Sequence, residues 1–150
     1  MLILGSFPGV ASLAARAYYA HPRNHFWPLL GAVLDEPLAT LAYPARLARI
    51  KARRVAVWDT IVACVRTGSL DSAIRDAQHG EVERIGKRAP GIRLVAFNGR
   101  TAARAERRWR DAGYATLVLP SSSPAFTRPF EEKFAAWREI AAYLDAVAEV

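Results

Sequence analysis

Short apolar runs alternate along this chain with segments whose apolar residues recur every three or four positions. Apolar runs bounded by turn-forming residues predict strands, whereas the longer periodic segments predict helices. The runs that predict strands lie at residues 2–5, 55–59, 92–99 and 114–120. Because helical segments separate them, the sequence predicts an α/β fold, a three-layer α/β/α sandwich with a central four-stranded parallel sheet. We expect residues 1–150 to form a single domain.

The helical segments differ in length and in the turn residues that interrupt them. The segment 69–77 predicts the start of a helix that is capped by Ser69 or Asp71. Pro44 interrupts the segment 38–54, which therefore predicts one or two short helices. The other predicted helices lie at 10–20, 25–34, 80–90, 100–113 and 130–150. The last of these carries a core-facing stripe made of Phe130, Phe134, Trp137, Ala141 and Leu144.

Hydrophobicity and cysteine content exclude several classes of protein. Hydrophobic residues make up 52% of the chain, yet no apolar run approaches the ~20 residues that cross a bilayer. The opening residues 1–9 are too short for a secretory signal and lack its charged start. The single cysteine, Cys64, cannot form an internal disulfide, and its apolar neighbours favour a buried structural thiol over a reactive one. We therefore expect a protein of the reducing cytoplasm.

The charge of the chain favours a polyanionic partner. The formal net charge is +7, and only three of the 21 basic residues are lysine. Arginine binds phosphate as a bidentate fork and stacks on bases, which makes nucleic acid a plausible partner. A coding bias toward arginine and alanine would produce the same composition without such a partner, so charge leaves both explanations open.

The ends of the predicted strands carry the loops that we expect to form a site. In open parallel sheets, ligands bind at the carboxyl ends of the strands. Those ends carry GSFPG, WDT, FNGRT and PSSSPA, at residues 5–9, 58–60, 97–101 and 120–125. All four loops are rich in small or hydrogen-bonding residues, and the fold would bring them to one edge of the sheet. Their convergence indicates a site more strongly than any one of them does.

Residues 21–27, HPRNHFW, combine two histidines with an asparagine and two aromatic residues. This composition fits a metal site, a catalytic centre, a surface that stacks on bases, or a turn before a helix. A metal site is disfavoured because Pro22 breaks the helical spacing of His21 and His25. Few further ligands exist beyond His79 and the lone cysteine, so we expect no bound metal.

The sequence lacks two common enzyme motifs. FNGRT resembles the end of a Walker A loop, but Leu94 stands where the first glycine is required. No G-x-S-x-G nucleophile elbow occurs in the chain. These two observations argue against a nucleotide triphosphatase and against a serine hydrolase with that elbow.

Six segments, taken in order, resemble the uracil-DNA glycosylase superfamily and, within it, the hypoxanthine-DNA (deoxyinosine) glycosylase branch. The segments are LILGSFPG, YYAHPRNHFW, VWDTI, GSLDSAI, FNGRTA and LPSSSPA. The resemblance extends from residue 2 to about residue 138, and AHPRN-x-FW is the feature most particular to this branch. It implies one uracil-DNA-glycosylase-like domain with a four-stranded parallel sheet between helices, in agreement with the hydrophobic pattern.

The resemblance implies a DNA base-excision repair enzyme. Such an enzyme hydrolyses the N-glycosidic bond of a deaminated base, here hypoxanthine, after flipping it out of the DNA. Uracil and xanthine are the alternative bases. No lysine lies in any strand-end loop, so we expect a monofunctional glycosylase without a Schiff-base lyase step and without a cofactor. Its partner would be DNA that contains deaminated bases, and we expect a monomer in a bacterial-type cytoplasm, associated with the nucleoid.

The catalytic residue implied by the resemblance is Asn24. Other branches have an aspartate or asparagine at the position of Ser6, and often a histidine at the position of Ser121. Neither serine can activate water or stabilise a departing base in the usual way. In the branch that this chain resembles, the asparagine of HPRN takes the catalytic role. Because an amide is no real base, Asn24 would position a water molecule for a largely dissociative reaction.

Other residues implied by the resemblance bind the base or the DNA. Phe7 or Phe26 would stack on the extruded base. Asp59 aligns with a strand-end asparagine that reads uracil in other branches, and it would read the polar edge of the base. The base-binding set is Ser6, Phe7, Phe26, Asp59 and Asn98. The set that contacts phosphates or the vacated stack is Ser121, Ser122, Ser123, Pro124, Ala125, Arg100 and Arg128.

Structural roles remain open for several of these residues. Asn24 is also a typical turn or cap residue, and Asp59 is a typical cap. Phe26 and Trp27 are equally typical of a core. The serines at 6 and 121 also fit a relative that binds DNA but has lost the chemistry.

Overall fold

The computed structural model describes residues 1–79 and 82–145. At its centre lies a sheet in the order β2-β1-β5-β6, with each neighbouring pair parallel. The strands are β1 (Leu2–Gly5), β2 (Ala56–Asp59), β5 (Leu94–Asn98) and β6 (Ala115–Leu119). The predicted α/β fold with a central four-stranded parallel sheet is confirmed.

The register of the sheet places the ends of three strands level with one another. Gly5 pairs with Asp59 across β1 and β2. Leu4 pairs with Phe97 across β1 and β5, so Asn98 lies one residue further toward the same edge. The last residues of these strands therefore face a common region beyond the sheet.

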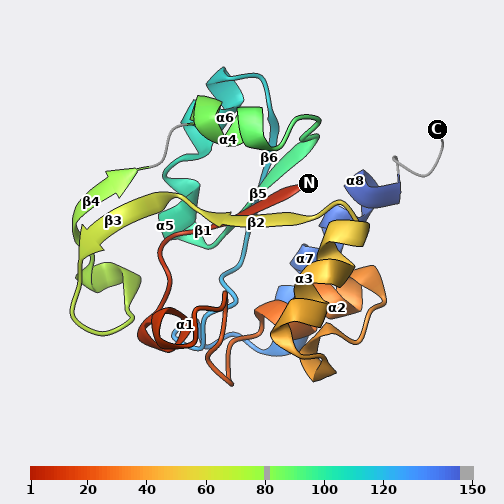
Figure 1. The fold of residues 1–150 in the computed structure, drawn as a ribbon, viewed down its shortest axis with the longest axis horizontal. Coiled ribbons are helices and arrows are strands. Elements are labelled where there is room, and N and C mark those ends of the chain that lie inside the picture. The colour runs from red at the N-terminus through yellow and green to blue at the C-terminus, as the bar shows by residue number, and fades with distance from the viewer. Residues whose placement is uncertain (80–81, 146–150) are drawn as a thin grey trace.

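Helices cover both faces of the sheet, which gives the molecule three layers (Figure 1). One face packs against α2 (Phe26–Leu34), α3 (Tyr43–Ala52) and α7 (Phe130–Trp137). The other face packs against α4 (Val82–Arg88), α5 (Arg100–Ala103) and α6 (Glu106–Asp111). Ile3 points into the first core, whereas Leu2 and Leu4 point into the second. Burial on both faces explains why the central strand is a continuous apolar run.

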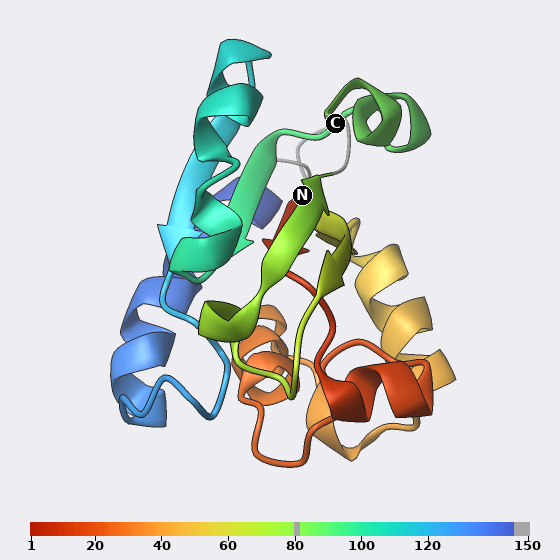
Figure 2. The ribbon, with the colours of Figure 1, turned by 90° about the vertical axis from the view of Figure 1, so that its left-hand side faces the viewer.

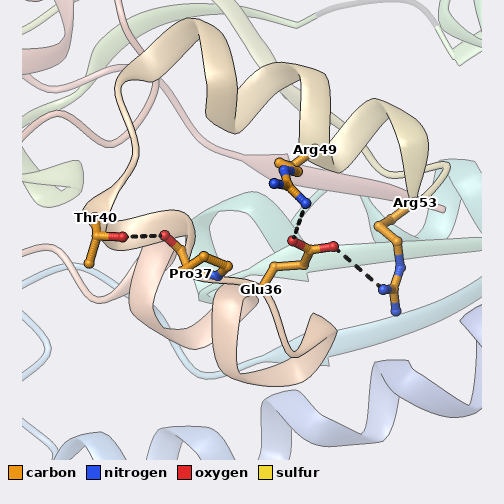
Figure 3. Close-up of polar contacts among 5 residues, drawn as sticks. All are labelled: Glu36, Pro37, Thr40, Arg49 and Arg53. Carbon is orange, nitrogen blue, oxygen red and sulfur yellow. Dashed lines mark hydrogen bonds and ion pairs between the residues drawn. The ribbon is translucent and has the colours of Figure 1, made fainter.

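The connection from α2 to α3 runs through η1 (Leu38–Thr40) and is held by Glu36. Its carboxylate lies between Arg49 and Arg53, at N–O distances of 3.2 and 3.7 Å (Figure 3). Because both arginines are about half exposed, each ion pair contributes at most about 1 kcal/mol.

Several predicted helices are shorter than expected. α1 (Val10–Ala15) ends where Arg16 adopts a left-handed conformation with φ of 50°. Pro44 lies in the first turn of α3, where its missing N–H has no helical partner to lose, so it begins that helix and does not interrupt it. The predicted helix 100–113 consists of α5 and α6, separated by a turn.

The predicted helix at 69–77 is wrong. The structure has an antiparallel hairpin of β3 (Ile61–Val65) and β4 (Arg75–His79), with η2 (Asp71–Ala73) in its connection. The apolar run of β3 supplies a pairing partner, and strand pairing overrides the weak helical preference of the segment. Cys64 lies in β3 and is only partly buried, because this two-stranded sheet leaves much of its surface open. Figure 1 shows the hairpin extending beyond the central sheet, and in Figure 2 it lies on the side that faces the viewer.

The C-terminal part of the chain follows the predicted helix in three pieces. α7 continues into η3 (Arg138–Ile140) and α8 (Ala141–Asp145). Trp137 is fully buried, and Phe130, Phe134 and Leu144 pack against the same core. The predicted residues 146–150 of this helix lie outside the described residues. No helix in the described part of the chain has the length and apolar character needed to cross a bilayer.

Candidate active site

A cavity of about 600 Å³ opens at the carboxyl edge of the sheet. All four strand-end loops line it, together with the connection between β3 and β4. We call residues 66–74 the hairpin loop and residues 120–126 the serine loop. The predicted residues that line the cavity are Ser6, Phe7, Asn24, Asp59, Asn98, Ser121, Ser122, Ser123, Pro124 and Ala125. Loops that lie far apart in the sequence thus share one cavity.

Asp59 and Tyr19 lie next to each other beside Gly5. A Cβ atom on Gly5 would be 2.7 Å from Asp59 Oδ1 and 2.7 Å from the Tyr19 hydroxyl oxygen, so only glycine leaves room for both. Burial raises the pKa of Asp59 to about 7, and the negative charge of Asp71 contributes to the increase. A carboxyl group with this pKa changes its charge near neutral pH.

Tyr19 lines the cavity, whereas Phe26 does not reach it. Phe26 is fully buried in the core beside Trp27, and its ring stacks on Tyr19 with 3.8 Å between centroids. The backbone of Tyr19 is left-handed, with φ of 54°, which is costly for an aromatic residue. The structure therefore leaves Phe7 as the predicted aromatic residue that faces the cavity.

The hydroxyl group of Tyr19 is buried and unsatisfied. Within residues 1–79 and 82–145 it has no hydrogen-bond partner. Burial raises the pKa of this phenol, and the Asp59 carboxylate raises it further. A buried hydroxyl without a partner costs free energy, so its presence at a cavity indicates a site for a ligand.

Asn24 lines the cavity from a tight turn that precedes α2. The side-chain carbonyl of Asn24 accepts a hydrogen bond from the Phe26 backbone N–H at 2.9 Å. The backbone N–H of Asn24 donates to the His21 backbone carbonyl at 3.0 Å. The turn role that the sequence left open is thus present. The same bonds fix the orientation of the amide, whose carbonyl retains a second lone pair and whose NH2 group can donate.

The hairpin loop is bonded to the first strand-end loop at several points. The Ser6 hydroxyl donates to Asp71 Oδ1 at 2.8 Å. The Val10 backbone N–H donates to the Ser69 hydroxyl at 2.9 Å. Arg66 donates to the Pro8 carbonyl and lies over the Phe7 ring, 5.3 Å from its centroid. These contacts make the hairpin loop one side of the cavity.

The serine loop is held by Asn98 from the end of β5. The Asn98 amide nitrogen donates to the Ser122 hydroxyl, and its carbonyl accepts the Ser122 backbone N–H, both at 2.8 Å. Gly99 has φ of 95°, and a Cβ there would lie 3.0 Å from Ser121 Cβ. Lys133 of α7 is fully buried and donates to the Ser123 carbonyl at 3.3 Å. These contacts hold the loop tightly against the sheet.

The two predicted phosphate-binding arginines lie outside the cavity lining. Arg128 pairs with Glu132 at 3.7 Å and lies 5.8 Å from the centroid of the Phe126 ring. Arg100 is exposed in the first turn of α5. Phe126 itself lines the cavity and is 37% exposed, so the arginine beside it lies near the cavity entrance.

The histidines of HPRNHFW point in different directions. His21 lines the cavity, and its Nδ1 accepts the Arg23 N–H at 3.1 Å. The His25 ring packs edge-on against Phe130, 5.5 Å from its centroid. In the described ranges, no three His, Cys, Asp or Glu side chains come together as metal ligands.

Sequence reasoning missed two groups that help to form the cavity. The sequence suggested Asp71 only as a helix cap, and it suggested no role for Tyr19. Both residues belong to segments that carry the family resemblance, GSLDSAI and YYAHPRNHFW. That resemblance is the signal in the sequence that could have identified them.

The fold and the cavity define the class of this protein: a parallel α/β sandwich with a ligand site at the carboxyl ends of its strands. A family model of the uracil DNA glycosylase superfamily matches residues 1–145. The chain belongs to this superfamily.

Relatives of known name extend the comparison. A protein of Methanosarcina barkeri named hypoxanthine DNA glycosylase is 37% identical over 139 residues, which cover 93% of this chain and 88% of the relative. A protein of the same name from Methanosarcina acetivorans is 39% identical over 140 residues, which cover 93% of this chain and 89% of the relative. The solution NMR structure of a candidate uracil DNA glycosylase from Methanosarcina acetivorans has a TM-score of 0.87 at 38% identity, covering 96% of this chain and 89% of that chain.

Proposed function

We propose that the chain is a monofunctional DNA glycosylase that removes hypoxanthine from DNA. The proposal is carried by one observation: the turn that bears Asn24 and the serine loop meet in one cavity. The His25 backbone N–H donates to the Ser122 carbonyl at 2.9 Å, which joins these two segments directly. The names of the two Methanosarcina relatives support hypoxanthine as the base.

In the proposed reaction, Asn24 positions the attacking water. The bond between C1′ of the deoxyribose and the base breaks, and the sugar develops positive charge before water adds to it. A group that only orients water is useful in such a dissociative reaction. The hydrogen bond from the Phe26 N–H to the Asn24 carbonyl supports this role, because it fixes the amide without using all of its hydrogen-bonding capacity.

Asp59 and Phe7 are the proposed base-reading residues. Hypoxanthine presents an N–H beside a carbonyl group, and an ionised carboxylate accepts from that N–H. Asp59 lies beside the backbone of Gly5 and Ser6, where such a contact is available. The ring of Phe7 faces the same cavity and would stack on the base. Asn98 would add to this set through the amide capacity that its bonds to Ser122 leave free.

The serine loop and nearby arginines are the proposed DNA-binding elements. The loop offers hydroxyl groups and backbone amides at the rim of the cavity, which suit flanking phosphates. Arg100 precedes the serine loop in the sequence, and Arg128 follows it. Both side chains are exposed, and their positive charges would contact phosphates. The net charge of +7 supports binding to a polyanion. We propose that the protein is a monomer and that it works in the cytoplasm. Light scattering after gel filtration would measure its mass and so test the proposed monomer.

Oligonucleotides that carry one inosine, uracil or xanthine test the proposal. After incubation and alkaline treatment, we expect a cleaved strand with inosine, and smaller or no amounts with the other two bases. Cleavage of uracil alone would make the chain a uracil-DNA glycosylase. Binding to every duplex without an abasic product would identify an inactive DNA-binding relative and would overturn the enzyme proposal.

A further inference from the structure

Hydrolysis at this site has to dispose of a proton, and Asn24 cannot accept it. When water adds to C1′, one of its protons must leave, and an amide is far too weak a base to take it. Any group with this role must lie in the same cavity and must be able to pass a proton onward. This question rests on the proposed function, since it concerns the same reaction.

Ser6 and Asp71 form a hydrogen-bonded pair in the wall of the cavity. Both residues line it, and Ser6 Oγ donates to Asp71 Oδ1 at 2.8 Å. Ser6 directly follows the last residue of β1, whereas Asp71 comes from the hairpin loop, 65 positions further along the chain. The hairpin loop therefore places a carboxylate against the hydroxyl group of Ser6 in the wall of the cavity.

The electrostatics of the cavity separate Asp71 from Asp59. Asp59 is mostly buried, and the charge of Asp71 contributes to the increase in its pKa to about 7. Asp71 is exposed, and its Oδ1 accepts a hydrogen bond from the Ser6 hydroxyl group at 2.8 Å. Asp71 is therefore the carboxylate of this pair that can pass a proton onward to solvent.

We propose that Ser6 and Asp71 together take up the proton of the attacking water. The oxygen of water forms a bond to C1′, and the C1′–N bond breaks, with its electron pair leaving on the base. Ser6 Oγ accepts the water proton while its own proton moves to Asp71 Oδ1. The departing base takes a proton from solvent, and Asp71 later returns one to solvent, so the net reaction is hydrolysis.

A purely structural role for Asp71 is the alternative to this proposal. The hydrogen bond between Ser6 and Asp71 also holds the hairpin loop to the first strand-end loop. Ser69 makes a second bond between the same loops, through the Val10 N–H at 2.9 Å. Ser69→Ala is therefore a matched control, because it weakens the same loop contact without removing a carboxylate.

Single-turnover cleavage of an inosine oligonucleotide, with its Kd measured separately, tests the proposal. Asp71→Asn keeps a hydrogen-bond acceptor for Ser6 but removes the base, and we expect it to slow cleavage by about 100-fold or more with unchanged Kd. Ser6→Ala should slow cleavage similarly, and combining both changes should add little. Ser69→Ala should change the rate less than about tenfold. Added formate should restore part of the rate of Asp71→Ala, because it replaces the missing carboxylate.

The possible outcomes separate this inference from the proposed function. If the parent protein cuts inosine and Asp71→Asn cuts equally fast, the inference is wrong and the proposed function stands. Equal losses in Asp71→Asn and Ser69→Ala, with weaker binding in both, would show a loop contact only and also overturn it. If the parent protein cuts none of the three bases, the proposed function fails and the proton relay fails with it. Thermal unfolding of each variant verifies that it is folded, and Ser6→Ala provides a second decision if Asp71→Asn is not.

Discussion

The two sides of the cavity differ in how well their polar groups are satisfied. On one side, Asn98 and Ser122 use each other's donors and acceptors in two bonds of 2.8 Å. On the other side, Asp59 has a raised pKa of about 7, and the Tyr19 hydroxyl, within the described part of the chain, has no partner. We call the first the serine side, and we call the second, Ser6, Tyr19, Asp59 and Asp71, the carboxylate side.

This difference separates a structural task from a chemical one. A fully satisfied buried network rigidifies the protein and fixes a loop in one position. Unsatisfied groups and perturbed carboxylates cost stability, and folded proteins retain them mainly where a ligand completes them. The serine side therefore fits the task of holding DNA, and the carboxylate side fits the reading and release of a base.

Asp59→Asn should produce the largest change in stability, and it should be a gain. The folded state binds the Asp59 proton more tightly than the unfolded chain does, because the pKa rises from 3.8 to about 7 on folding. Protonated Asp59 therefore adds to the free energy of unfolding. This contribution is fully present below pH 4 and is lost as the pH rises through 7. At pH 8 the variant should therefore be more stable by roughly 4 kcal/mol, and the gain should vanish near pH 4.

Urea unfolding at pH 4, 6 and 8 measures this gain. Asp111→Asn is the matched control, because Asp111 is exposed on α6 and its change should be small at every pH. An Asp59→Asn variant with a pH-independent change in stability would contradict the described carboxylate side.

Asn98→Ala should produce a loss of stability on the serine side. The substitution removes two hydrogen bonds and leaves the buried Ser122 N–H unpaired, which costs about 2–3 kcal/mol. Ser121→Ala is the control. Among the described residues, the Ser121 hydroxyl accepts one hydrogen bond, from the Ser123 N–H at 3.1 Å in a partly buried position, and its loss should cost about 1 kcal/mol or less. Chemical denaturation measures the free energy of unfolding of the two variants. Equal losses would contradict the larger stabilisation expected from the two hydrogen bonds of Asn98.

Tyr19→Phe should have the smallest effect on stability. The variant keeps the ring that stacks on Phe26 and removes a hydroxyl that has no partner among the described residues. Stability should therefore not fall, and a gain of up to about 1 kcal/mol is expected. Tyr43→Phe removes a hydroxyl that accepts the Tyr18 N–H at 3.1 Å, and it should cost about 1 kcal/mol. A larger loss for Tyr19→Phe than for Tyr43→Phe in thermal unfolding would mean that the Tyr19 hydroxyl is satisfied in the protein.

The central sheet could be predicted because its strands are nearly apolar throughout. Residues 2–5 and 94–98 are buried on both faces, which leaves a continuous hydrophobic run that no surface element would carry. The β3–β4 hairpin could not be predicted in the same way. Its second strand is polar and short, and only pairing with β3 gives it that conformation.

The site was predictable in its position but not in its contacts. The rule for parallel sheets brings the strand ends together, and Asp59 and Asn98, which end β2 and β5, both line the cavity. The bond between Ser6 and Asp71 joins residues 65 positions apart and depends on the hairpin that the sequence did not indicate. Whether Phe7 or Phe26 faces the cavity depends on where α2 begins, and a helix boundary cannot be located that closely from sequence.

Release of free hypoxanthine from an inosine-containing duplex tests the central claim most directly. Chromatography would measure the free base after incubation with the parent protein and with Asn24→Ala. We expect the parent protein to release hypoxanthine and leave an abasic site, and Asn24→Ala to release it at least about 100-fold more slowly while still binding the DNA. Release no faster than from untreated duplex would contradict the account, and equal release by both proteins would contradict the role of Asn24.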